Sequence, residues 1–209
     1  MNKPIYILLL LLCLNCGSPI SQNNIKNNTD IHVLFIGNSL TYTNNLPKLV
    51  EREAKKNSVN LTSKMIAFPN YAIEDHWNDG KVQQEIASKK YDFVVLQQGP
   101  SSQSAGRQML IQYGKKYRDL CKANNSKLCF FMVWPSQTYF NTFNGVIKNY
   151  RDAAKTNEAI LLPVGEVWKS YIITKGRLDY YSDDGFHPSL KGSQIAAEVI
   201  SNILIQEME

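Results

Sequence analysis

Short apolar runs alternate with longer amphipathic segments from residue 31 to the end of the chain. Five of the short runs are predicted as strands, over residues 32–36, 61–67, 93–96, 128–133 and 159–162. Four of these runs, all except the one over residues 61–67, show little alternation of polar and apolar positions. Strands of this kind are buried on both faces, which is typical of a parallel sheet covered by helices.

Six amphipathic segments are predicted as helices, over residues 46–57, 80–89, 103–124, 142–157, 165–173 and 189–206. In the last one, Ile195, Val199 and Ile203 share an apolar stripe with Ala196, Ile200 and Leu204, at the spacing of a core-facing surface. The alternation of strand and helix predicts one domain over residues 31–209. Its expected fold is a three-layer α/β/α sandwich with a central, mostly parallel five-stranded sheet and right-handed crossovers.

Polar and turn-forming residues follow every predicted strand. Ligands of open parallel sheets bind beyond the carboxyl ends of the strands, so these residues are candidates for a functional site. Four of the segments contain a proline, which cannot continue a central strand. The segments are Gly-Asn-Ser at 37–39, Pro-Asn-Tyr at 69–71, Gln-Gln-Gly-Pro at 97–100, Trp-Pro-Ser-Gln at 134–137 and Pro-Val-Gly-Glu at 163–166.

Residues 1–15 have a positive start and an apolar run, as in a secretory signal peptide. The run is too short to span a membrane as a helix. The segment resembles a bacterial lipoprotein signal, in which cleavage falls before a cysteine that is then lipidated. Cys16 fits that position, although Asn15 stands where a smaller residue is usual. An ordinary signal peptide removed at another bond is the alternative, and both predict an exported protein.

Residues 16–30 follow the signal and are polar and rich in Asn. They bury too little apolar surface to offset the entropy of ordering, so we expect a flexible tether between the lipidated Cys16 and the domain. The resemblance to a lipoprotein therefore implies a protein of the bacterial cell envelope, anchored to a membrane through lipid.

Composition narrows the choice of partners and cofactors. The 209 residues, 44% of them hydrophobic, can bury one sizeable core. The formal net charge is +5, but the lysines are scattered rather than gathered with aromatic residues, so a nucleic-acid partner has little support. Cys121 and Cys129 remain in the mature body. An export compartment permits a disulfide between them, although Cys129 is expected to be a buried small hydrophobe, and no Cys/His cluster indicates a metal site.

Ser39 is a candidate nucleophile, and a serine nucleophile needs a base that takes its proton. The chain has three histidines. His32 opens the first strand, at the end opposite the expected site. His76 follows the second strand and is expected in an ion pair or in packing. His187 is the candidate base because it stands directly before the last predicted helix, with Asp184 three residues earlier.

The segment from Asp184 to Pro188 reads Asp-Gly-Phe-His-Pro. Gly185 favours a turn, in which Asp184 could accept a hydrogen bond from one imidazole nitrogen of His187 and leave the other free for Ser39. Pro188 keeps His187 just outside the last helix. Either segment alone is ordinary turn chemistry, whereas the two together indicate a Ser-His-Asp triad.

These residues resemble the SGNH or GDSL-type hydrolases, which are esterases and acetylesterases. The first block of that family is Gly-Asp-Ser-Leu after the first strand, and here it reads Gly-Asn-Ser-Leu at 37–40. The last block, Asp-x-x-His-Pro, matches Asp184, His187 and Pro188. Gly192 and Ala196 fit the small residues of the helix that follows. The resemblance extends over residues 31–206 and implies a flavodoxin-like three-layer fold.

The resemblance also implies an oxyanion hole, which this chain would have to build differently. In the family the donors are the serine N–H, a Gly after the second strand and an Asn after the third. Here Asn70 stands near the Gly position, and Gln97 and Gln98 stand near the Asn position. Asn70 could donate its backbone N–H, and either glutamine could supply a side-chain amide. Alternatively, Asn70 forms a turn and the glutamines cap the sheet edge.

The resemblance implies a serine hydrolase that cleaves carboxylic esters through an acyl-enzyme, with no cofactor or metal. Short acyl or acetyl groups on glycans are the implied substrates. Tyr71, Trp77 and Trp134 could stack on sugar rings or simply pack. One alternative is a non-catalytic glycan-binding surface lipoprotein with the same fold. Another is an anion cradle formed by residues 39–43, which would leave the Asp184 and His187 pair without a role.

Overall fold

The computed structural model of the protein describes Met1 and residues 30–208. The predicted signal peptide, the lipidation site Cys16 and nearly all of the tether lie outside the described residues. Asp30, expected as the end of the tether, is the first residue of the first strand. The first strand thus begins two residues earlier than predicted, and the domain one residue earlier.

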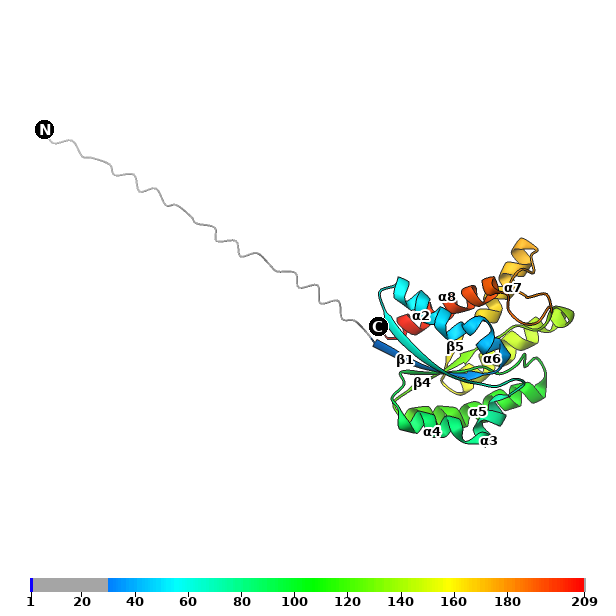
Figure 1. Ribbon diagram of the computed structural model, residues 1–209, viewed down its shortest axis with the longest axis horizontal. Coiled ribbons are helices and arrows are strands. Elements are labelled where there is room, and N and C mark those ends of the chain that lie inside the picture. The colour runs from blue at the N-terminus through cyan, green and yellow to red at the C-terminus, as the bar shows by residue number, and fades with distance from the viewer. Residues whose placement is uncertain (2–29, 209) are drawn as a thin grey trace.

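A parallel sheet of five strands forms the centre of the domain, in the order β2-β1-β3-β4-β5. This confirms the predicted fold class. Figure 1 shows the sheet between two layers of helices, with α2 and α8 on one face and α3, α4 and α5 on the other. The strands are β1 (Asp30–Gly37), β2 (Asn60–Ala67), β3 (Phe93–Leu96), β4 (Lys127–Phe131) and β5 (Ile160–Leu162).

The six predicted helices are present, and every end lies within two residues of the expected one. They are α2 (Leu46–Lys56), α4 (Lys81–Ser88), α5 (Ser104–Ala123), α6 (Phe143–Thr156), α7 (Val164–Lys175) and α8 (Leu190–Gln206). Two short helices were not predicted, α1 (Ser39–Tyr42) and α3 (Ile73–Asp79). Helices of this length are marginal by themselves and depend on packing, so the sequence pattern does not reveal them.

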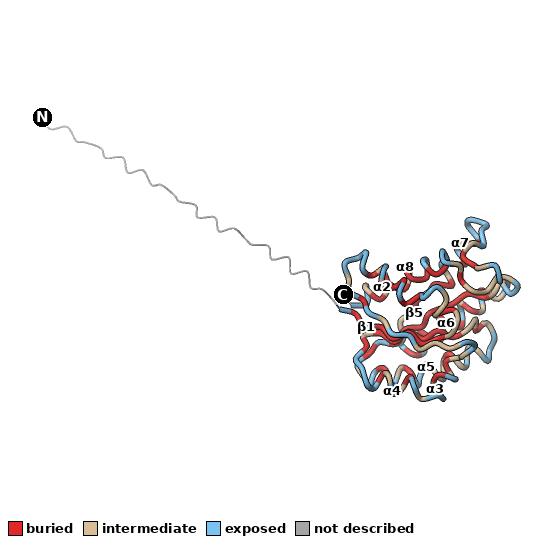
Figure 2. Tube along the Cα trace, in the orientation of Figure 1, coloured by how far each residue is buried: buried red, intermediate tan, exposed pale blue. Residues whose placement is uncertain are grey.

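The core lies on both faces of the sheet, as the lack of polar alternation indicated. All four residues of β3 are buried. Figure 2 shows the strands buried between helices whose outer surfaces are exposed. On α8, Ala196, Ile200 and Leu204 are buried, while the neighbouring row of Ile195, Val199 and Ile203 is partly buried against the core. The terminal helix therefore docks through its apolar stripe.

The two cysteines of the described chain are both buried, and their thiols are free. Burial raises the pKa of the Cys121 thiol to about 12, which keeps it protonated and unreactive. None of the helices in the described part of the chain is long and apolar enough to cross a bilayer.

Gly192, in the first turn of α8, lies where the helix approaches an aromatic cluster. A Cβ at this position would overlap the Tyr180 carbonyl oxygen and lie 2.6 Å from the Trp168 ring. Trp168 is fully buried and stacks on Trp134 at a centroid distance of 3.4 Å. The close approach therefore sets the position of α8, and with it the position of the segment that precedes the helix.

We expect Gly192→Ala to destabilise the domain by about 2 kcal/mol, because the added methyl group meets a backbone carbonyl and a packed ring that cannot move apart easily. Urea unfolding followed by circular dichroism measures this change. Gly99→Ala is the control, since a Cβ at Gly99 meets nothing within 4 Å. Equal stability of the two variants would contradict the packing account.

Candidate active site

The structure brings together the three side chains that were predicted to form a triad. Ser39 is the first residue of α1, directly beyond β1, and His187 lies in the connection between α7 and α8. The Oγ of Ser39 is 2.9 Å from the Nε2 of His187. The Nδ1 of His187 is 2.5 Å from Oδ2 of Asp184. Residues separated by 148 positions are thus joined in one hydrogen-bonded series.

Asn38 shapes the backbone that presents Ser39. Its Oδ1 accepts a hydrogen bond from the Leu40 N–H at 3.2 Å, which caps the start of α1. Its Nδ2 donates to the Tyr71 carbonyl at 3.0 Å. An ionised aspartate accepts hydrogen bonds but cannot donate one. The Asn that replaces the family's Asp therefore makes a second bond, which ties the nucleophile segment to the loop after β2.

The turn that holds His187 is built around the Asp184 carboxylate. Its Oδ1 accepts hydrogen bonds from the Ser182 hydroxyl and from the N–H groups of Phe186 and His187, at 2.8–2.9 Å. Gly185 has a φ of 69°, which favours glycine. The hydrogen bonds, led by the one from His187, hold the pKa of Asp184 well below its ordinary value. Asp184 is therefore an ionised partner for the imidazole.

Groups beyond β4 support this turn from the side of the sheet. The Nε1 of Trp134 donates to the Phe186 carbonyl at 3.0 Å, and the Gln137 N–H donates to the Gly185 carbonyl at 2.8 Å. Trp134 is fully buried, so it does not offer a face to a sugar ring. The expectation for this residue thus resolves in favour of packing, with an added role in holding the His187 turn.

Asn44 connects the two halves of the site. Its Nδ2 donates to the Pro188 carbonyl at 3.1 Å and to the Ser193 hydroxyl at 2.9 Å. The residue has a φ of 55°, a left-handed conformation that Asn tolerates better than most residues. Sequence reasoning missed Asn44, because its partners lie about 145 positions away and no local pattern marks it.

The backbone N–H groups of Ser39 and Asn70 have no hydrogen-bond acceptor among the described residues. Asn70 is exposed and has a φ of 62° in the turn after β2. The next residue, Tyr71, accepts the hydrogen bond from Asn38, so this turn is held beside the nucleophile segment. The two N–H groups are thus available donors at one edge of the sheet.

The two glutamines predicted to face an oxyanion are placed differently. Oε1 of Gln97 accepts hydrogen bonds from the Asn38 N–H at 2.8 Å and from the Thr41 hydroxyl at 2.9 Å, and its Nε2 is buried without a partner in the described structure. The amide of Gln98 bonds the Ile73 N–H and the Met109 sulfur. The Nε2 of Gln97 is buried and the Nε2 of Gln98 already donates to the Met109 sulfur, so neither amide nitrogen is an open donor for a bound substrate.

The other two histidines lie outside the series of Ser39 and His187. His32 is exposed near the amino end of β1, and its Nδ1 lies 2.7 Å from the Thr62 hydroxyl. His76 is buried in α3, and its Nε2 lies 2.8 Å from the Gly37 carbonyl oxygen. Desolvation is the main cause that lowers the pKa of His76, so its imidazole is neutral at pH 7.

A cleft of about 460 Å³ opens between the loops that follow β3 and β4, and it reaches the side of His187 through Phe186, whose ring lies against the imidazole at a centroid distance of 5.2 Å. Phe186, Tyr139, Pro100 and Pro135 give it an apolar surface, and the remaining lining side chains are hydroxyls and an amide, from Ser102, Ser136, Thr142 and Gln103. No lining side chain is charged. Sequence reasoning missed Tyr139 and Phe186 as candidate contacts, since neither belongs to a recognisable motif.

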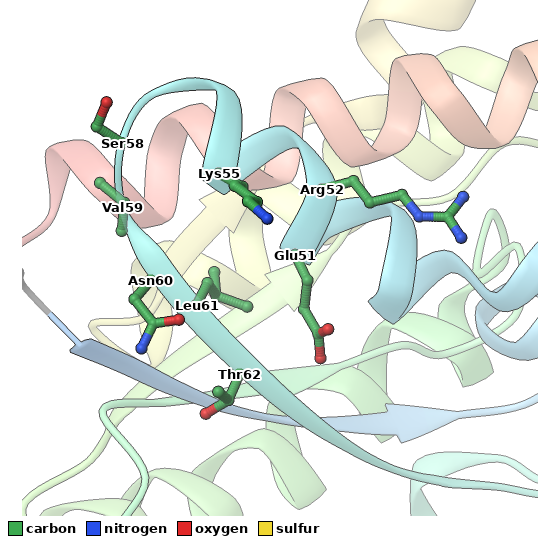
Figure 3. A pocket seen from close by; sticks show the side chains of 8 residues that line it. All are labelled: Glu51, Arg52, Lys55, Ser58, Val59, Asn60, Leu61 and Thr62. Atoms are coloured by element: carbon green, nitrogen blue, oxygen red, sulfur yellow. The ribbon is translucent and has the colours of Figure 1, made fainter.

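A second groove, of about 610 Å³, lies between α2 and the amino end of β2 (Figure 3). Its lining includes Glu51, Arg52 and Lys55. The amino ends of the strands are at the opposite edge of the sheet from Ser39, so this groove is not part of the site. Within residues 30–208, no group of three or more His, Cys, Asp or Glu side chains could hold a metal ion.

Comparisons with known proteins indicate the family and the fold of the chain. Residues 38–200 match the family model of the GDSL-like lipase/acylhydrolases, which is well over half of the chain. No curated protein matched the sequence.

Solved structures share the fold at low sequence identity. A candidate SGNH hydrolase from Slackia heliotrinireducens has a TM-score of 0.73 and 20% identity, over 84% of this chain and 100% of that one. A lipase/acylhydrolase from Enterococcus faecalis has a TM-score of 0.68 and 14% identity, over 85% and 96%. An acetyl xylan esterase has a TM-score of 0.65 and 16% identity, over 83% and 100%. The chain belongs to the GDSL-like lipase/acylhydrolase family.

Proposed function

We propose that the protein hydrolyses carboxylic esters with Ser39 as nucleophile, His187 as general base and acid, and Asp184 as the group that orients the imidazole. The observation that supports this most strongly is the unbroken series from the Ser39 hydroxyl through both ring nitrogens of His187 to the Asp184 carboxylate, at 2.9 Å and 2.5 Å. Such a series is the arrangement that converts a weakly nucleophilic hydroxyl into a catalytic one.

The reaction proceeds in two steps. As the Oγ of Ser39 forms a bond to the ester carbonyl carbon, its proton moves to Nε2 of His187. The tetrahedral intermediate then expels the alcohol, which takes that proton from the imidazolium, and an acyl-enzyme remains. Water attacks the acyl-enzyme by the same proton transfers and releases the acid. The anionic Asp184 stabilises the imidazolium in both steps.

The negative charge on the carbonyl oxygen needs donors in both steps. The backbone N–H groups of Ser39 and Asn70 are the donors that this proposal assigns, because neither is occupied within the described residues. The hydrogen bond from Asn38 to the Tyr71 carbonyl supports the assignment, since it holds the Asn70 turn next to Ser39. These two donors would correspond to the family's serine and glycine N–H groups and would act without its side-chain amide.

The cleft beside His187 is proposed to hold the alcohol part of the ester. The imidazole delivers its proton to the leaving oxygen, so the alcohol departs on the side of His187, where Phe186 lines the cleft. A lining without charge and with both apolar and hydroxyl groups suits a neutral, hydroxylated alcohol such as a glycan. Together with the acetyl xylan esterase among the structural neighbours, this favours short acyl or acetyl groups on glycans.

The proposed place of action is the bacterial cell envelope. The lipoprotein-like signal and Cys16 would attach the exported protein to a membrane through lipid, and residues 17–29 would separate the anchor from the domain. Radiolabelled fatty acid incorporated by the wild type and not by Cys16→Ala would support this attachment, whereas equal incorporation would contradict it.

We expect Ser39→Ala to lower kcat for a short-chain acyl ester by about 10³-fold or more, because the variant cannot form an acyl-enzyme. Hydrolysis of p-nitrophenyl acetate measures the loss, and the thermal unfolding midpoint should stay close to that of the wild type. Equal rates in the two proteins would contradict the esterase mechanism. Retained glycan binding by an inactive wild type would favour the non-catalytic alternative instead.

We expect Asp184→Asn to lower kcat by about 10³- to 10⁴-fold with a smaller change in KM. An amide can donate to Nδ1 of His187, which would leave the proton on Nε2, where it blocks acceptance of the Ser39 proton. Steady-state kinetics on the same ester measures both parameters. Asp183→Asn is the matched control, since Asp183 is exposed and adjacent but outside the hydrogen-bonded series. A similar loss in both variants would refute the assigned role.

A further inference from the structure

The Gly37–Asn38 peptide unit, one residue before the nucleophile, is held by two buried side chains from different parts of the chain. The Gly37 carbonyl lies 2.8 Å from Nε2 of His76, and the Asn38 N–H donates to Oε1 of Gln97 at 2.8 Å. This carbonyl and this N–H belong to the same peptide bond, which is planar. The carbonyl and the N–H of this one planar peptide, which point to opposite sides, are therefore both held by side chains one residue before Ser39.

Gln97 reaches this peptide from the end of β3. It is 1% exposed, and its Oε1 also accepts a hydrogen bond from the Thr41 hydroxyl at 2.9 Å. The Asn38 N–H can only donate, so the atom that faces it must be the amide oxygen. Because Thr41 follows Ser39 by two residues, Gln97 bonds the backbone before the serine and a side chain after it. A Cβ at Gly37 would lie 2.5 Å from Oε1, which shows how closely Gln97 approaches the chain.

His76 reaches the same peptide from α3. It is 1% exposed and lies against the rings of Phe68 and Tyr71. The charged groups around it are Asp75, Asp79 and Lys81, yet burial outweighs them and keeps the ring neutral. A neutral imidazole carries one N–H, and the Gly37 carbonyl can only accept, so Nε2 is the protonated nitrogen.

We propose that Gln97 and His76 are positioning residues that clamp the Gly37–Asn38 peptide and thereby set where the Ser39 hydroxyl lies relative to His187. The proposal rests on the proposed function of Ser39. Neither residue contacts Ser39 or His187 through a hydrogen bond among the described residues. Their effect is on the backbone that carries the nucleophile, where a shift of about 1 Å can cost about 10²-fold in rate.

Gln97→Met tests the oxygen side of the clamp. Methionine has a similar size but no acceptor, so the Asn38 N–H and the Thr41 hydroxyl lose their partner. We expect kcat to fall by about 10- to 100-fold with KM changed much less, because substrate binding does not use these groups. Gln97→Glu keeps an oxygen at this position and should recover most of the lost kcat.

His76→Leu and His76→Gln test the donor side in the same way. Leucine removes the side-chain donor to the Gly37 carbonyl and leaves it only the Phe68 N–H at 3.2 Å, whereas the glutamine amide can replace the imidazole. If both residues act on one peptide, the double variant Gln97→Met/His76→Leu should lose less than the product of the two single losses. Independent, multiplicative losses would contradict a shared target.

The rate of amide hydrogen exchange at Asn38 measures how firmly this N–H is held, and it does not depend on activity. We expect faster exchange of this amide in Gln97→Met and protection restored in Gln97→Glu. Asn157→Leu is the matched control, because Asn157 is also 1% exposed but bonds the Ile111 and Ala153 carbonyls at the opposite edge of the sheet. It should lose stability while kcat and Asn38 exchange stay unchanged.

Two results would overturn the proposal. One is unchanged Asn38 exchange and wild-type kcat in Gln97→Met. The other is an equal loss of kcat in the Asn157→Leu control, which would make the effect a general loss of stability. A wild type without Ser39-dependent hydrolysis would instead refute the proposed function, and the exchange rates of Asn38 would still decide whether the clamp exists.

Discussion

The hydrogen bond between Ser39 and His187 is the interaction on which the whole account of the site depends. Each residue belongs to a segment that is ordinary in isolation, a turn after a strand and a loop before a helix. The parallel sheet brings the end of β1 to the edge where the α7–α8 connection returns. Asn44 then bonds the Pro188 carbonyl, so the two segments are joined by a contact besides the reacting pair. The 2.9 Å separation is thus a consequence of the fold.

Some polar groups at this edge of the sheet hold the site in place, and others are left to take part in the reaction. Asn38 caps α1 and bonds the loop after β2. Gln97 and His76 hold the Gly37–Asn38 peptide. Most donors and acceptors of these side chains are used in hydrogen bonds within the fold. The backbone N–H groups of Ser39 and Asn70 remain without an acceptor among the described residues. The residues that depart from the family blocks therefore support the nucleophile in a different way, so the departures do not by themselves indicate a weaker nucleophile.

Much of the fold could be predicted from the sequence because strands buried on both faces and an amphipathic last helix leave clear patterns. Ser39, Asp184 and His187 could be named because they stand in short motifs at strand and helix ends. The short helices α1 and α3 left no such pattern, since packing rather than local preference stabilises them. The directions of Gln97 and Gln98 could not be predicted either. Both follow the same strand, and only the packed structure determines that one faces α1 and the other faces α3 and α5.

The central claim is that Ser39 is the group that attacks the ester carbonyl. Peptide mass spectrometry of the wild type, after exposure to an organophosphonate that mimics the tetrahedral intermediate, tests it most directly. The account predicts one phosphonyl adduct, located on Ser39, and a strongly reduced rate of labelling when Asp184 is changed to Asn. An adduct on another residue, or no adduct on a folded protein that still hydrolyses esters, would contradict it.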